Sequence, residues 1–125
     1  MTSKPMTRLE QLRQQHHARW LADLKQRVNT LLAAQSGSNC AAPDQIYVFG
    51  SRARGDWDGL SDTDLLVVSA SKAEAEIWAD NLLDQGVAQD VIALDRAAWR
   101  QLPEHPSVIW QHVARDAQPL LESPR

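Results

Sequence analysis

The longest regular pattern of apolar positions in the sequence lies between Thr7 and Ala34. Apolar side chains recur there at steps of three and four residues, the spacing that places them on one face of an α-helix. They are Leu9, Leu12, Trp20, Leu21, Leu24, Val28, Leu31 and Leu32. Ser, Gly, Asn and Pro gather between Gln35 and Pro43, so the pattern predicts an amphipathic helix over 7–34 that ends in a loop.

Three short apolar runs further along the chain predict β-strands. They are Gln45–Phe49, Thr63–Ser69 and Val87–Leu94, all with β-branched residues or aromatic residues. The first two are expected to be neighbours in one sheet, because a short connection separates them. Within that connection, Ser51 is expected to cap a short helix that Gly55 ends.

Helix signals also follow the second and third runs. The capping-box pattern at 71–74 opens a helix to about Gln85, and Gly86 supplies its stop. Asp95 is expected to cap a short helix that ends near Leu102. A last helix is predicted from residue 106 or 107 to about Ala114, after a loop bracketed by prolines, and a final short strand over 119–122.

This order of elements predicts an α/β (α+β) fold with a small mixed β-sheet flanked by helices. The sequence shows no repeat, low-complexity tract or linker, so residues 1–125 are expected to form a single domain, with 1–6 as a loose tail. Apolar residues make up 43% of the 125 residues, which is enough for one core.

Composition excludes several classes of function. The net charge is −3, and extended nucleic-acid binding is therefore not expected, because proteins that contact many phosphates are usually basic. A single cysteine, Cys40, excludes an internal disulfide and a Cys-rich zinc site. No run of 18 apolar residues predicts a membrane span, and no apolar signal core is seen, so a cytoplasmic location is expected.

The chemically informative stretch begins where the first strand runs into Gly50 and Ser51. Glycine allows the backbone to approach a ligand closely. The unpaired N–H groups at the start of a helix favour phosphate, and the Ser51 hydroxyl adds a further donor. An ordinary turn is the alternative reading of this Gly-Ser pair.

Asp62 and Asp64 are spaced two residues apart at the start of a predicted strand, so both carboxylates are expected on one face. Like charges side by side on a sheet repel, and a hard cation such as Mg²⁺ relieves that repulsion. A solvated strand end is the alternative. A third acid, Asp90, interrupts the third predicted strand, where Asp is unfavourable. Asp95 competes with it for the same role but stands where a helix cap is expected.

Gly50-Ser51, ten residues, Asp62-Thr63-Asp64 and a lone Asp90 one helix later resemble the motif of the DNA polymerase β superfamily of nucleotidyltransferases. The run Gly-Ser-Arg-Ala-Arg-Gly leading to Ser-Asp-Thr-Asp-Leu-Leu is similar to the minimal nucleotidyltransferases of prokaryotes. The motif covers residues 46–68 well, and the resemblance extends more loosely to about residue 122. It implies a polymerase β-like nucleotidyltransferase fold.

The resemblance also implies roles for these residues. Asp62 and Asp64 would hold two Mg²⁺ ions, and Asp90 would bind the ion that activates an acceptor hydroxyl. Ser51 and the helix start would hold the phosphates of a nucleoside triphosphate such as ATP. Arg54, ranked before Arg52, would pair with phosphate, since guanidinium groups match it; a surface salt bridge is the alternative for both.

The minimal group resembles the antitoxin half of toxin–antitoxin modules, whose partner is a helical HEPN-type ribonuclease. This resemblance implies a protein adenylyltransferase that adds AMP to a tyrosine of that toxin, because no second domain for an acceptor is expected in this chain. A homo-oligomer would also supply an acceptor site. Two alternatives remain: a non-catalytic antitoxin that acts by direct contact, and transfer to a small-molecule hydroxyl.

Overall fold

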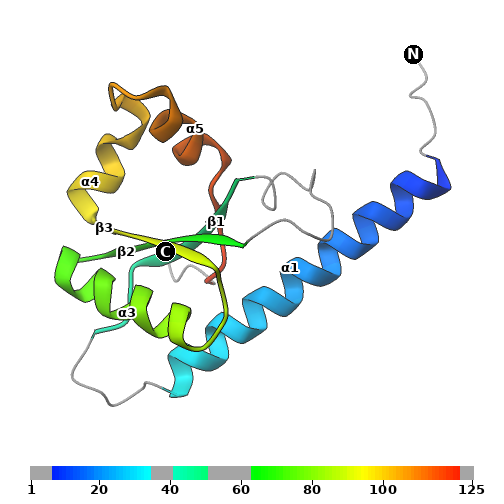
Figure 1. Cartoon of the computed structure of the whole chain (residues 1–125), viewed down its shortest axis with the longest axis horizontal. Coiled ribbons are helices and arrows are strands. Elements are labelled where there is room, and N and C mark those ends of the chain that lie inside the picture. Colours follow the sequence, from blue (N-terminus) through cyan, green and yellow to red (C-terminus); the bar gives the residue numbers. More distant parts are fainter. Residues whose placement is uncertain (1–6, 35–40, 51–62, 122–125) are drawn as a thin grey trace.

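Residues 7–34, 41–50 and 63–121 are described in the computed structural model of the chain. They form a four-stranded sheet with helices on both faces (Figure 1), and the predicted fold class is confirmed. The strands are β1 (Gln45–Phe49), β2 (Asp64–Ser69), β3 (Asp90–Asp95) and β4 (Gln118–Pro119). The helices are α1 (Arg8–Ala34), α3 (Lys72–Asp84), α4 (Arg96–Gln101) and α5 (Val108–Asp116), with a 3₁₀ turn, η1 (Leu102–Glu104).

The sheet is mixed, with the strand order β3-β2-β1-β4. β1 pairs antiparallel with β2 and with β4, so the two runs expected to be neighbours are neighbours. β2 and β3 pair in parallel, and α3 lies between them in the sequence. A crossover helix of this kind is the usual connection between parallel strands.

Helices cover the two faces of the sheet. Leu65 and Val67 of β2 belong to the core that α1 and α3 share, whereas Leu66 and Val68 pack on the side of α4 and α5. Figure 1 shows these helix pairs on opposite sides of the strands. Because side chains alternate between faces, a strand buried on both reads as a continuous apolar run.

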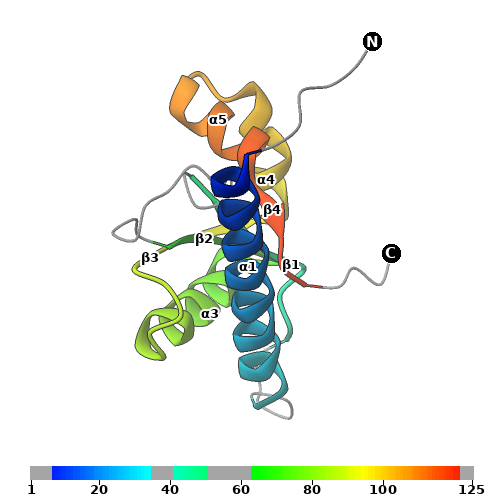
Figure 2. The same ribbon diagram turned by 90° about the vertical axis from the view of Figure 1, so that its right-hand side faces the viewer.

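Helix α1 follows the predicted bounds closely. Its first turn is capped by Thr7, whose hydroxyl accepts a hydrogen bond of 3.1 Å from the Glu10 amide. All of its buried residues lie in its second half, at Leu24, Val28 and Leu31. Leu9, in its first half, is 62% exposed. The helix, seen lengthwise in Figure 2, therefore packs on the sheet through its C-terminal part.

Helix α3 confirms the predicted start and stop signals. The Ser71 hydroxyl accepts a 3.2 Å hydrogen bond from the Glu74 amide, and Gly86 follows the helix with a φ of 69°. Trp78 anchors this helix in the core, and its indole nitrogen donates to the Ala41 carbonyl at 2.8 Å. None of the helices in the described ranges has the length and apolar character that crossing a membrane requires.

The third strand differs most from its predicted bounds. It begins at Asp90 rather than Val87 and ends at Asp95. Val87 and Ala88 are apolar because they fill the core as loop residues, at 6% and 5% exposure. Burial without strand pairing gives the same apolar signal as a strand.

The C-terminal elements follow the predictions with smaller shifts. η1 occupies part of the predicted loop between prolines, α5 extends two residues past Ala114, and β4 lies at 118–119. The predicted short helix at 51–55 lies outside the described residues.

Candidate functional site

Three of the six predicted site residues are described in the structure: Gly50, Asp64 and Asp90. Ser51, Arg54 and Asp62 lie outside the described residues, as does Arg52. The geometry of the site is therefore built from the end of β1 and the starts of β2 and β3.

Asp64 and Asp90 are brought together by the pairing of β2 and β3. They are aligned partners at the first position of the parallel ladder. Aligned residues on neighbouring strands project to the same face, and such strands lie about 4.8 Å apart. Alternation along β2 and β3 assigns both carboxylates to the face of Leu66 and Ile92, which α4 and α5 cover further along. Asp64 is half-buried and Asp90 is exposed.

Gly50 brings the end of β1 against the Asp64 carboxylate. Phe49 is the β1 partner of Asp64, and Gly50 follows with a φ of 80°. A Cβ atom at Gly50 would lie 3.2 Å from Asp64 Oδ2. Glycine adopts a positive φ without steric cost, and it also leaves room for this carboxylate. The close approach seen here is to the Asp64 side chain, and the predicted approach of Gly50 to a ligand stays a prediction.

The start of β2 is tied to β3 by Gln89, a residue that the sequence pattern did not single out. Its side-chain oxygen accepts a 2.7 Å hydrogen bond from the Thr63 amide. The Thr63 carbonyl in turn accepts from the amides of Gln89 and Asp90, at 3.1 and 3.4 Å. The only signal in the sequence was a polar residue inside an apolar run.

Asp95 lies at the other end of β3 and has a different structural role. It pairs with Ser69 in the ladder, five residues beyond Asp90, which is roughly 16 Å along a strand. Its carboxylate accepts a 2.8 Å hydrogen bond from the Ala98 amide and caps α4, as predicted. Of the two candidates for a third acid, Asp90 is the one that lies beside Asp64.

An ion pair holds α4 to the sheet at the end opposite Asp64. Arg96, the first residue of α4, donates to both carboxylate oxygens of Asp44, with 2.9 Å between Nη2 and Oδ1. The hydrogen bond from Arg96 lowers the pKa of Asp44. Burial, and then the Asp44 charge, raise the pKa of Tyr47, whose ring stacks on Trp99 with 4.3 Å between centroids.

Asp64 and Asp90 are suitable ligands for a magnesium ion. Mg²⁺ prefers oxygen ligands and is commonly held by one or two carboxylates together with substrate phosphates and water. Among residues 7–34, 41–50 and 63–121, no three His, Cys, Asp or Glu side chains cluster closely enough to hold a metal. The described residues therefore supply two carboxylates, and the third predicted ligand, Asp62, lies outside them.

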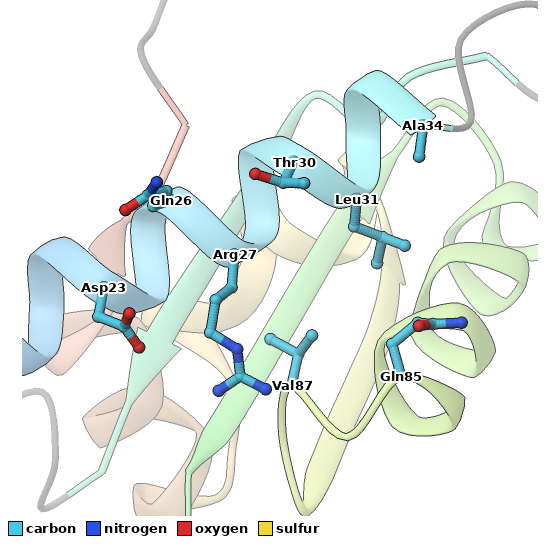
Figure 3. Close-up of a pocket in the computed structure, with 8 residues that line it drawn as sticks. All are labelled: Asp23, Gln26, Arg27, Thr30, Leu31, Ala34, Gln85 and Val87. Atoms are coloured by element: carbon cyan, nitrogen blue, oxygen red, sulfur yellow. The ribbon is translucent and has the colours of Figure 1, made fainter.

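A cavity of about 480 Å³ lies elsewhere, between α1 and the turn that leads from α3 to β3 (Figure 3). Arg27 reaches from α1 to this turn and donates to the Gly86 carbonyl at 3.2 Å. Leu31 and Val87 line the cavity and belong to the core under α1 and α3. The cavity is thus on the face of the sheet opposite the one that carries Asp64 and Asp90.

Comparisons with known proteins show the family to which the chain belongs. Residues 30–107, more than half of the chain, match the nucleotidyltransferase domain. The fold is similar to the crystal structure of a candidate nucleotidyltransferase from Sulfolobus solfataricus, with a TM-score of 0.50 and 17% sequence identity. That match covers 95% of this chain and 90% of the other. No curated protein matches the sequence. The matched range contains Gly50, Asp64 and Asp90, and the chain belongs to the nucleotidyltransferase domain family.

Proposed function

We propose that this protein is a Mg²⁺-dependent nucleotidyltransferase that moves AMP from ATP onto a hydroxyl group of a partner protein. The observation that carries the proposal is the alignment of Asp64 with Asp90 on one face of the sheet, beside Gly50. Family membership supports nucleotide transfer in general. The choice of AMP and of a protein acceptor rests on the resemblance of the motif to minimal nucleotidyltransferases.

Asp64 and Asp90, together with Asp62, would hold two Mg²⁺ ions. Ions bound there would supply positive charge that stabilises an in-line displacement at phosphorus. Ser51 and Arg54 would bind the β- and γ-phosphates, since hydroxyl, backbone N–H and guanidinium groups are phosphate donors. Positioning and charge neutralisation of this kind provide most of the catalysis in phosphoryl transfer.

Asp90 is suited to act on the acceptor, because it is exposed whereas Asp64 is half-buried. In the proposed reaction the acceptor oxygen forms a bond to the α-phosphorus of ATP. The bond from that phosphorus to the bridging oxygen of the β-phosphate breaks, and pyrophosphate leaves. The Asp90 carboxylate takes up the proton of the acceptor hydroxyl.

A HEPN-type toxin is the proposed acceptor, with a tyrosine hydroxyl as the target. Exposed apolar side chains on two helices support contact with a protein: Leu9 on α1 is 62% exposed, and Ile109 on α5 is 74% exposed. The same side chains also favour the second candidate function, an antitoxin that binds its partner without nucleotide transfer. Contiguous exposed apolar side chains are typical of protein contacts, and Val108, at 58% exposure, is the neighbour of Ile109 in the sequence.

Transfer of label from ATP carrying the isotope at the α-phosphate tests the proposal. The co-purified partner protein serves as acceptor in the presence of Mg²⁺. We expect label on the partner with the wild-type protein and none with Asp62→Asn or Asp64→Asn. Asp84→Asn is a matched control, because Asp84 is exposed at the end of α3. A stable complex without label on the partner would favour the antitoxin that acts by binding alone, and it would contradict the proposed nucleotide transfer.

A further inference from the structure

The backbone of Thr63, directly before Asp64, is bonded to one short segment of the chain. Its amide donates to the Gln89 side-chain oxygen, and its carbonyl accepts from the amides of Gln89 and Asp90. We refer to these three hydrogen bonds as the Thr63–Gln89 clasp. Thr63 is 7% exposed, and the hydrogen bond from its amide to the exposed Gln89 side chain is partly buried, so loss of this acceptor would leave the amide poorly satisfied.

The clasp lies where the β2–β3 ladder begins. The first aligned pair is Asp64 and Asp90, and β3 has no strand residue before Asp90. The Gln89 side-chain oxygen therefore takes the place that the carbonyl of a further strand residue would occupy. This extends the pairing of the two strands one residue beyond the acids.

The position of the clasp matters because the acids beside it repel each other. Like charges on directly neighbouring strand positions disfavour pairing, and strand ends are where pairing is most easily lost. Without the clasp, the ends of β2 and β3 would separate at this pair first. Their separation would move the two carboxylates apart.

We propose that Gln89 is a positioning residue that fixes the spacing of the Asp64 and Asp90 carboxylates and thereby sets their affinity for a divalent cation. The inference rests on the proposed function, since it assigns these two acids to the metal. Gln89 does not itself touch the cation. It acts through the Thr63 backbone, as residues behind a metal ligand commonly do.

Binding of Mn²⁺, followed by the electron paramagnetic resonance of the free ion, tests this inference on the full chain. Gln89→Met keeps the length of the side chain but removes the acceptor oxygen, and we expect its Kd for Mn²⁺ to rise about 10-fold. Gln89→Glu keeps an acceptor oxygen for the Thr63 amide, so its Kd should not rise. Gln101→Met, at the exposed end of α4, is the matched control and should bind as the wild type does.

Equal Mn²⁺ binding by Gln89→Met and Gln101→Met would overturn the inference, and so would equal weakening by Gln89→Met and Gln89→Glu. If Gln89→Met binds weakly while the wild type binds Mn²⁺ yet transfers no nucleotide, the clasp stands and the proposed transfer fails. If the wild type transfers AMP and Gln89→Met binds Mn²⁺ with the same Kd as the wild type, the proposed function stands and only the role of Gln89 is refuted.

A second measurement needs no variant. Because linkage is reciprocal, a cation that depends on the clasp must also stabilise the clasp. Saturating Mg²⁺ is expected to slow hydrogen exchange of the Thr63 amide in the wild-type protein by about 10-fold, the same factor as the expected loss of affinity. Exchange of Thr63 that is unchanged by Mg²⁺ would contradict the role of Gln89, even if Gln89→Met fails to fold.

Discussion

Asp64 and Asp90 are aligned partners on two parallel strands, although a whole helix separates them in the sequence. The pairing places two carboxylates on one face at the beginning of both strands. Like charges at neighbouring strand positions disfavour pairing. The Mg²⁺ proposed above would relieve this repulsion, because both acids would bind it.

Replacement of Asp64 or Asp90 is expected to reduce nucleotide transfer without lowering stability. Asp64→Asn and Asp90→Asn are each expected to reduce nucleotide transfer by more than about 100-fold, since loss of a ligand should exceed the loss of a residue behind it. The melting temperature should stay equal or rise, because repulsion between the two acids is relieved. Transfer assays and thermal unfolding on the same preparations measure both effects. A variant that keeps full transfer would disprove the metal assignment.

Gly86 is a matched control for testing whether the close contact between Gly50 and the Asp64 carboxylate matters for activity. Both have a positive φ, of 80° and 69°, so Gly50→Ala and Gly86→Ala should each lower the free energy of unfolding by about 1–2 kcal/mol. Only at Gly50 does the added Cβ meet Asp64, because nothing lies within 4 Å at Gly86. Transfer should therefore fall at least about 10-fold in Gly50→Ala alone. Equal activity of the two variants would refute a role for this contact.

Asp95→Ala tests which acid accompanies Asp64. Removal of the N-cap of α4 should lower the free energy of unfolding by about 1 kcal/mol. Nucleotide transfer measured well below the melting temperature should be unchanged, because Asp95 lies at the far end of β3. If Asp95→Ala lost transfer while Asp90→Asn stayed active, Asp95 rather than Asp90 would be the third acid.

The Asp44–Arg96 ion pair predicts an acid-sensitive contribution to stability. The pKa of Asp44 in the folded protein is below its ordinary value of 3.8. The pair therefore stabilises the fold fully at pH values well above 3.8, and this contribution is lost as the pH falls through the lowered pKa. Asp44→Asn should unfold at a lower temperature than the wild type at pH 7.

The same two proteins, compared by thermal unfolding in steps down to pH 2.5, should converge as Asp44 becomes protonated. High salt should also reduce the difference, because the Arg96 side chain is 53% exposed and its charge is screened. A difference that persists unchanged at pH 2.5 would indicate a packing role for Asp44 instead.

Local signals made most of the fold predictable. The bounds of α1, β1 and α3 follow from periodicity, a short strand run and a capping box, each of which acts within a few residues. The start of β3 was not predictable in this way. Val87 and Ala88 are apolar because the core needs them, and composition does not distinguish that need from strand pairing.

The candidate site was only partly accessible from the sequence. The residue types and spacing singled out Gly50, Asp64 and Asp90, but the choice between Asp90 and Asp95 depends on strand register, which is a tertiary property. Gln89 was not singled out because one polar residue inside an apolar run is a weak signal. Its hydrogen bond to Thr63 spans 26 positions and exists only once β2 and β3 pair.

The place of β3 in the described sheet has one more consequence. It is the strand at one edge, and its apolar run Val91–Leu94 is bracketed by Asp90 and Asp95. Edge strands attract strands from other molecules, and flanking charges act as gatekeepers against aggregation. The charge of Asp90 would thus also oppose pairing of this edge with another strand, and Asp90→Asn would remove one of the two charges that flank the run.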